Sequence, residues 1–383
     1  MGLKPRALKL ERMPVLVMAI VALLAGMWAA LLRLGWVLPA AGVNLPAEHG
    51  PLMVSGFLGT LITLERAVAL GGLWAYGAPA LTGAGAMVLL AGVAGLPGPL
   101  LITLGSIALM ADFVLILRRQ NELFTVAMAL GAVAWVIGNA LWMAGWPIPE
   151  MTPWWMAFLV LTIMGERLEL SRLSGPSPAA RPAFALATGL LLSGLALLTY
   201  GVRVGFAMLG AGMLGFAAWI ALFDVARRTA RHGGLPGFVA ANLLFGAFWL
   251  GMGGAMRLAF PLALDFFQYD AILHAVFLGF VFSMIFAHAP IIFPAIMGRP
   301  LPFLRLYYLH VAALQLSLVL RIGGDLAGLA SAWHWGGTLN VAAVIMFLAD
   351  TAYGIAFGAR LAGVAAEMAG VARAGSLGKT LPR

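Results

Sequence analysis

The chain has 383 residues, of which 63% are hydrophobic and only 10% are charged. Soluble domains carry about 25% charged residues, so a soluble fold is excluded. Apolar stretches of roughly 20 residues, the length that crosses ~30 Å of hydrocarbon, recur along the whole chain. The absence of cysteine excludes disulfides, thiolate metal sites, iron–sulfur clusters and covalently attached haem.

These stretches predict an all-α polytopic membrane protein with about twelve transmembrane helices. The predicted spans are 14–36, 49–71, 76–96, 99–117, 124–146, 153–173, 182–202, 205–226, 236–258, 269–295, 304–325 and 335–358. We expect one transmembrane domain over 1–360, followed by a mobile, basic cytoplasmic tail over 361–383.

The distribution of positive charge predicts the orientation of the spans. Only Arg33, Arg203, Arg257 and Arg321 fall near one side, and all the other Lys and Arg residues fall on the opposite side or in the tails. Cytoplasmic loops carry such an excess of Lys and Arg. We therefore expect a bacterial inner membrane protein with both termini in the cytoplasm, and we interpret the net charge of +9 as topology, not as nucleic-acid binding.

The candidate chemistry lies with the histidines, of which there are six. His232 and His334 fall in predicted connections and are interpreted as interfacial. The other four lie within or at the edge of apolar spans, where an ionisable side chain indicates a functional site by default. Along the predicted spans, His49 and His274 fall near the outer surface, and His288 and His310 fall in the inner third.

The spacing of two of these residues sharpens the prediction. His274 and His288 are fourteen residues apart in one predicted helix. At ~100° and ~1.5 Å per residue they share a helix face and lie roughly 21 Å apart along the axis. One helix could in this way hold two haems, one near each membrane surface. Imidazole is a common axial haem ligand and also suits copper and zinc.

Two further features fit a haem. Arg257 and Arg321 fall at the outer ends of their predicted helices, where they could pair with haem propionates; the alternative is that they reach lipid headgroups. Glycines beside the histidines (Gly50, Gly56, Gly59 and Gly279) could let a flat macrocycle approach, although small residues also serve ordinary helix packing in membranes.

Two segments carry a family resemblance. The segment Glu48-His49-Gly50-Pro51-Leu52-Met53 and the segment that starts at His274 resemble the haem–copper oxidase subunit I superfamily, and more closely its divergent relative, the NnrS family. The resemblance implies a subunit I-like bundle in which His49 and His274 are the axial ligands of a low-spin haem b. His288 and His310 would then form the second haem or metal site.

The chain departs from the oxidase pattern. Ile272 stands where the second oxidase histidine of that helix would be, and spans 153–173 and 182–202 contain no histidine, so the copper-B site is missing. The resemblance therefore implies a redox protein of nitric oxide or denitrification metabolism, or of transmembrane electron transfer, with one or two haems b and copper as a further expectation. A periplasmic cytochrome or a quinol would donate electrons.

Two other function classes remain open. Twelve helices also suit a secondary transporter, although carriers usually place polar binding residues around broken helices at mid-membrane, where this sequence has few. A non-catalytic subunit of a larger respiratory complex is equally compatible with the spans. Whether the chain is an enzyme is not decided by its sequence.

Overall fold

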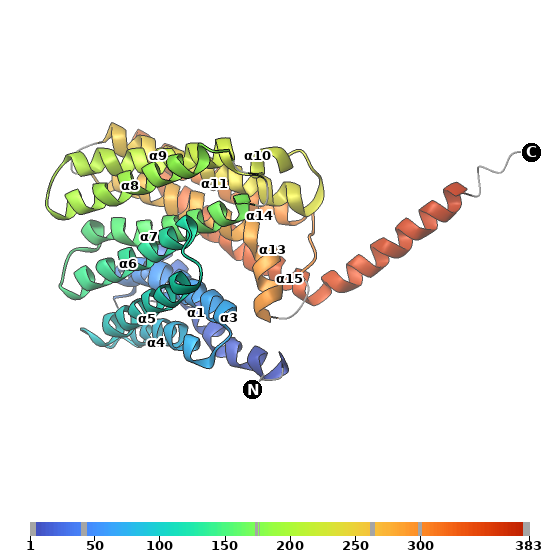
Figure 1. The fold of residues 1–383 in the computed structure, drawn as a ribbon, viewed down its shortest axis with the longest axis horizontal. Helices are drawn as coiled ribbons and strands as arrows, with labels where there is room; N and C mark the ends of the chain where they lie inside the picture. The colour runs from blue at the N-terminus through green and yellow to red at the C-terminus, as the bar shows by residue number, and fades with distance from the viewer. Residues whose placement is uncertain are drawn as a thin grey trace, which may run out of the picture.

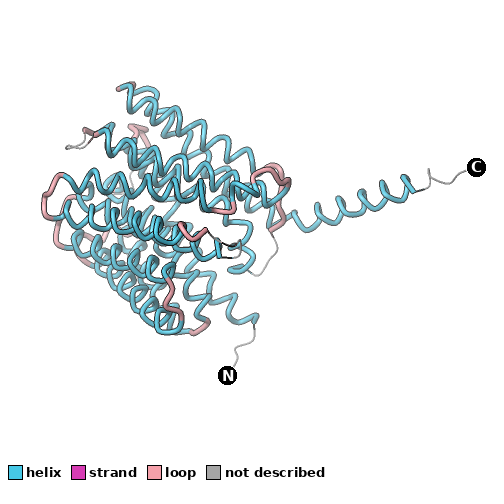
Figure 2. Tube along the Cα trace, turned by 45° about the horizontal axis from the view of Figure 1, so that its top comes forward, coloured by secondary structure: helices cyan, strands magenta, loops and turns pink. Residues whose placement is uncertain are grey.

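The computed structural model describes residues 5–39, 44–172, 175, 177–260, 265–297 and 301–377, and the side chains of 5–11, 295–297 and 358–377 are not described. Throughout these ranges the regular structure is helical, and the helices lie side by side in one bundle (Figures 1 and 2). The predicted all-α fold is thereby confirmed.

Several spans are continuous helices: α1 (Pro5–Arg33), α5 (Pro97–Arg119), α6 (Leu123–Met143), α7 (Ile148–Ser171), α8 (Ala180–Thr199), α9 (Val204–Phe223), α11 (Gly234–Ala259), α14 (Tyr307–Ala327) and α15 (Ala330–Leu377). The others are composite. One joins η1 (Leu45–Glu48), α2 (His49–Pro51), η2 (Leu52–Gly59) and α3 (Thr60–Leu70); another joins η3 (Leu73–Tyr76) and α4 (Gly77–Leu90); a third joins α12 (Phe266–His274), η5 (Ala275–Phe282) and α13 (Ser283–Met297). The short α10 (Ala226–Thr229) is a connection.

Within the described part of the chain, eleven helical segments are long and apolar enough to cross a membrane, and each matches a predicted span. The remaining predicted span, 153–173, corresponds to α7, a helix of 24 residues that is largely buried. It is less apolar than the others because it carries Glu150, Glu166, Arg167 and Glu169. The chain is therefore a membrane-spanning helical bundle, and its exposed leucines, valines and isoleucines form the lipid-facing surface.

Consecutive helices pack against each other as antiparallel neighbours. The most extensively packed pairs are α14 with α15, α6 with α7, α8 with α9, α9 with α11, and α4 with α5. The two composite spans with histidines lie in the interior, where η2 packs on α1 and η5 packs on α11. Phe57 of η2 and Phe282 of η5 lie with their ring centroids 6.2 Å apart, so the two segments meet inside the bundle.

Both η2 and η5 are π-helices of eight residues. The first begins three residues after His49, and the second begins directly after His274. π-Helical turns are rare and often occur at functional sites. The sequence analysis did not predict the two π-helices. Over only eight residues, an α-helix with 3.6 residues per turn and a π-helix with slightly more residues per turn give nearly the same pattern of apolar residues.

The C-terminal helix differs from the prediction in length. α15 continues to Leu377, beyond the predicted end of its span at residue 358, and its last part projects away from the bundle (Figure 1). Residues 361–377 of the predicted tail are thus helical in backbone, while 378–383 lie outside the described residues. α1 begins at the end of the bundle from which α15 departs (Figures 1 and 2).

The glycines expected to admit a macrocycle mostly serve packing between helices. A Cβ on Gly279 would lie 2.4 Å from Cβ of Trp249, and a Cβ on Gly59 would lie 2.4 Å from the indole of Trp135. Gly56 faces Ala86 and Ala22 in the same way. Each π-helix therefore accepts a neighbouring helix through a missing side chain, which is the second interpretation of these residues.

This packing generates a prediction. Gly279→Ala should lower the free energy of unfolding by about 1–3 kcal/mol, because its methyl group overlaps Trp249 in a filled interior. Gly189→Ala in α8 is the matched control, since nothing lies within 4 Å of the added Cβ. Thermal unfolding of both variants in detergent measures the difference. Equal stability of the two variants would contradict the close approach of α11 to η5.

Candidate functional site

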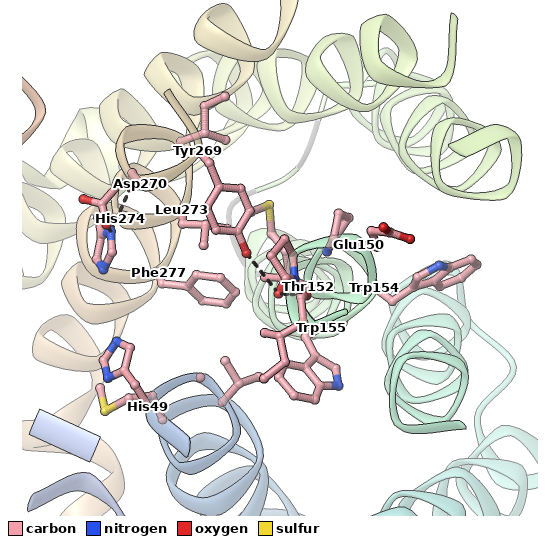
Figure 3. A pocket seen from close by; sticks show the side chains of 18 of the residues that line it. His49, Glu150, Thr152, Trp154, Trp155, Tyr269, Asp270, Leu273, His274 and Phe277 are labelled. Carbon is pink, nitrogen blue, oxygen red and sulfur yellow. Dashed lines mark hydrogen bonds and ion pairs between the residues drawn. The ribbon is translucent and has the colours of Figure 1, made fainter. Parts of the chain in front are cut away.

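His49 and His274 line one cavity of about 960 Å³ at one end of the bundle. The cavity walls come from α1, the His49 span, α7, α8, α9, α11, α12 with η5, and α14. Its volume lies at the upper end of the ~300–1,000 Å³ typical of cofactor and ligand sites. Figure 3 shows both imidazoles on the same side of the cavity, with a gap between them and Phe277 beside it. The sequence-predicted outer pair is thus brought together.

The hydrogen bonds of the two rings determine which nitrogen faces a ligand. Nδ1 of His49 donates to the backbone carbonyl of Gly26 at 2.8 Å. Nδ1 of His274 donates to the backbone carbonyl of Asp270, also at 2.8 Å. A neutral imidazole whose Nδ1 carries the proton keeps its lone pair on Nε2. Both rings therefore present an electron-pair donor, as an axial haem ligand must.

Carboxylates and arginines reach the same cavity. Arg33, Arg257 and Arg321 line it together with Glu150, Asp265 and Asp270. Arg257 is buried, with its guanidinium carbon 4.0 Å from the centroid of the Phe206 ring, and Nη2 donates to the carbonyl of Phe260 at 2.5 Å. Arg33 was recognised in the sequence only as an outer cation, and its position in the cavity wall adds a third arginine to the predicted two.

Arg321 differs from the predicted role. Its Nε and Nη2 donate to the two carboxylate oxygens of Asp270 at 2.8 and 3.0 Å. Both side chains are nearly buried, with exposed fractions of 8% and 10%. Arg321 lines the cavity, and its guanidinium is held by the carboxylate of Asp270.

Asp270 is the site residue that the sequence analysis missed. Its Oδ1 lies 3.3 Å from Nδ1 of His274, in addition to the bond that its backbone carbonyl accepts. The available signal was its position four residues before His274 in an apolar helix, which puts an acid and a histidine on one helix face. Tyr269 and Trp333 also line the cavity, and Tyr269 donates to Oγ1 of Thr152 at 3.4 Å (Figure 3).

The inner histidines are not brought together. The ring of His310 lies 4.6 Å from the ring of Phe286. His288 follows Phe286 by two residues in α13, which is ~200° around the helix, so it faces away from His310.

Each inner histidine has its own partner. Nδ1 of His288 donates to the carbonyl of Met284 at 2.6 Å, and Nδ1 of His310 donates to Oδ2 of Asp350 at 2.9 Å. Nε2 of both rings is buried and makes no hydrogen bond within the described residues. Phe238, Phe286, Phe347 and Tyr307 enclose His310. These aromatic rings pack around the imidazole of His310.

Among the described side chains, no group of three or more His, Asp or Glu residues is arranged to hold a metal ion. Two imidazoles would be the complete protein ligand set of a six-coordinate haem, since the macrocycle supplies the other four donors. His49 and His274 offer such a pair in one cavity.

Ion pairs close the opposite end of the bundle. Arg66 pairs with Glu166, and Arg167 donates from Nε and Nη2 to the carboxylate of Asp224 at 2.8 Å each. The pair between Arg66 and Glu166 thus joins the end of α3 to the end of α7. Asp224 also accepts from the backbone N–H of Ala226 at 2.8 Å, which ties α9 to α10.

Comparison with known proteins gives a family and no activity. A family model described as a domain of unknown function, DUF8744, matches residues 12–377. No curated protein matches the chain.

The buried pair at the inner end generates a prediction. Asp224→Asn should destabilise the protein by about 3–5 kcal/mol, because it leaves the guanidinium of Arg167 buried without its anion. Glu122→Gln breaks the exposed pair with Arg181, at 3.3 Å, and should cost at most about 1 kcal/mol. Thermal unfolding in detergent compares the two, and a loss for Glu122→Gln as large as that for Asp224→Asn would contradict the assignment.

Proposed function

The chain belongs to the DUF8744 family, which carries no assigned activity, and we propose that it is a redox protein that binds one b-type haem between His49 and His274. The observation that carries the proposal is the pair of imidazoles in one cavity, each with Nδ1 hydrogen bonded to a backbone carbonyl and Nε2 left to bind iron. Such a cofactor, when bound, supplies reversible one-electron chemistry at iron.

The protein would contribute binding, orientation and the exclusion of water. His49 and His274 would be the axial ligands, and apolar side chains such as Met53, Phe277 and Phe282 form the surrounding walls. Arg257 and Arg33 are the cations that the propionates would meet. If both imidazoles hold the haem, the cofactor would supply electron transfer without an open position for a substrate.

One haem at one end of the bundle favours electron exchange on one membrane side over transfer across the membrane. Transfer across would need a second centre near the other end, and His288 and His310 hydrogen bond to different partners, the carbonyl of Met284 and the carboxylate of Asp350. We therefore propose that donor and acceptor, a quinol or a periplasmic cytochrome among them, meet the cavity end. In the orientation that the charge bias predicts, this end faces the periplasm and both termini face the cytoplasm.

A role in nitric oxide metabolism remains a prediction that rests on the resemblance to the NnrS family. With both axial positions filled, nitric oxide would reach iron only after one imidazole had left. A shift of the haem spectrum on adding nitric oxide would support this role.

A transporter is the alternative function. It would bind a solute in the cavity, and this hypothesis assigns no role to the two imidazoles that line the cavity.

The test is the haem content of the full chain, purified in detergent from a haem-replete host. A reduced-minus-oxidised spectrum and pyridine haemochrome analysis should give one b-type haem per chain. His49→Gly and His274→Gly should each lose it, and free imidazole should restore binding in either variant, which shows that the fold survived. His288→Ala, His310→Ala and the interfacial control His334→Ala should keep it.

Two results would overturn this proposal. A wild-type chain without haem would remove the cofactor and leave the transporter as the stronger hypothesis. Loss of all haem from His310→Ala, with a folded protein, would move the site to the inner end of the bundle.

A further inference from the structure

We infer that Arg321 and Asp270 form a positioning clamp for His274, in which Asp270 fixes the orientation of this imidazole and lowers the reduction potential of the proposed haem, while Arg321 holds the carboxylate in place and moderates its charge. The inference rests on the proposed function, and it concerns two residues that would not touch the iron themselves. It replaces the sequence-based expectation that Arg321 binds a propionate.

The contacts run in one line from α14 to the imidazole. Arg321 in α14 holds both carboxylate oxygens of Asp270 in α12, at 2.8 and 3.0 Å. Asp270 in turn meets Nδ1 of His274 twice, through its backbone carbonyl at 2.8 Å and through Oδ1 at 3.3 Å. With the carboxylate fixed by two hydrogen bonds, the imidazole one turn further along α12 has little freedom to rotate.

The next layer holds Arg321 itself in place. Its Nη1 lies 3.5 Å from Oδ1 of Asn340, whose Nδ2 donates to Oγ of Ser317 at 2.7 Å. A Cβ on Gly336 would lie 2.5 Å from the backbone nitrogen of Arg321, so α15 packs directly on α14 at this residue. Arg321 and Asn340 are both buried, so the clamp is built into the core of the bundle.

The two proposed ligands therefore differ. Nδ1 of His49 donates to the neutral carbonyl of Gly26, whereas Nδ1 of His274 also faces a carboxylate. A carboxylate acceptor raises the basicity of a metal-bound imidazole. A more basic ligand and a nearby negative charge both favour the oxidised, more positive iron, so the potential falls.

The first variant removes the charge of the clamp and keeps the backbone contact. Asp270→Asn should shift the ratio of reduced to oxidised haem at least tenfold towards the reduced form at a fixed potential, which is a rise of about 59 mV for one electron. Asp265→Asn is the matched control, because Asp265 lines the same cavity and caps α12 without contacting His274. Its shift should be less than half as large.

The second set tests whether the two residues act together. Arg321→Gln should lower the potential of the wild-type chain, since it frees the Asp270 carboxylate to act on His274. The same substitution in the Asp270→Asn background should produce a clearly smaller change, because the partner is already gone. Arg321→Lys keeps the charge but not the two-point contact, and should lower the potential by less than Arg321→Gln.

The measurements are redox titrations followed at the haem absorption bands, with electron paramagnetic resonance of the oxidised state to report the orientation of the imidazole. Equal potentials for wild type, Asp270→Asn and Arg321→Lys, all with haem bound, would overturn the clamp and leave haem binding intact. Additive effects of Asp270→Asn and Arg321→Gln would also overturn it. A wild-type chain without haem would overturn the proposed function and, with it, this inference.

Discussion

A neutral imidazole has one N–H group and one lone pair, and inside a membrane bundle water can satisfy neither. At His49 and His274 the bundle satisfies the N–H group with a backbone carbonyl and directs the remaining nitrogen to a cavity. The candidate site depends on these different roles of the two ring nitrogens. Two polar side chains that are costly to bury in a membrane bundle thereby offer two electron-pair donors at one cavity. The proposed haem, its propionate partners and the clamp on His274 all follow from this arrangement.

The two π-helices account for how the bundle reaches this arrangement. η2 and η5 follow the two histidines almost directly, and they meet at Phe57 and Phe282 inside the bundle. Each receives an indole at a glycine, Trp135 at Gly59 and Trp249 at Gly279. The indole nitrogens are satisfied as well, by Ser55 and by Gln315. The interior beside the two π-helices is thus closely packed at Gly59 and Gly279.

The two ends of the bundle differ in how their charged side chains are arranged. At the cavity end, a buried Arg321–Asp270 pair stands beside further cations that line an open volume. At the other end, Arg66–Glu166 and Arg167–Asp224 join helix ends. Breaking such buried pairs is costly because the remaining charge cannot reach water. We interpret the inner pairs as structural and the outer pair as part of the site.

The sequence by itself determined the membrane class, the helical fold and the approximate bounds of the spans, because the hydrocarbon thickness fixes how long an apolar stretch must be. It also identified His49 and His274, because an ionisable residue in an apolar span is rare enough to be noticed. It did not determine which side chains meet. His288 and His310 share a depth, yet a rotation of ~200° between Phe286 and His288 separates them. Arg321 was assigned to a ligand because Asp270, fifty-one residues away, becomes its partner only when α12 packs on α14. Depth follows from position along the chain, whereas the partner of a side chain follows from the rotation and packing of helices, and these only the tertiary structure decided.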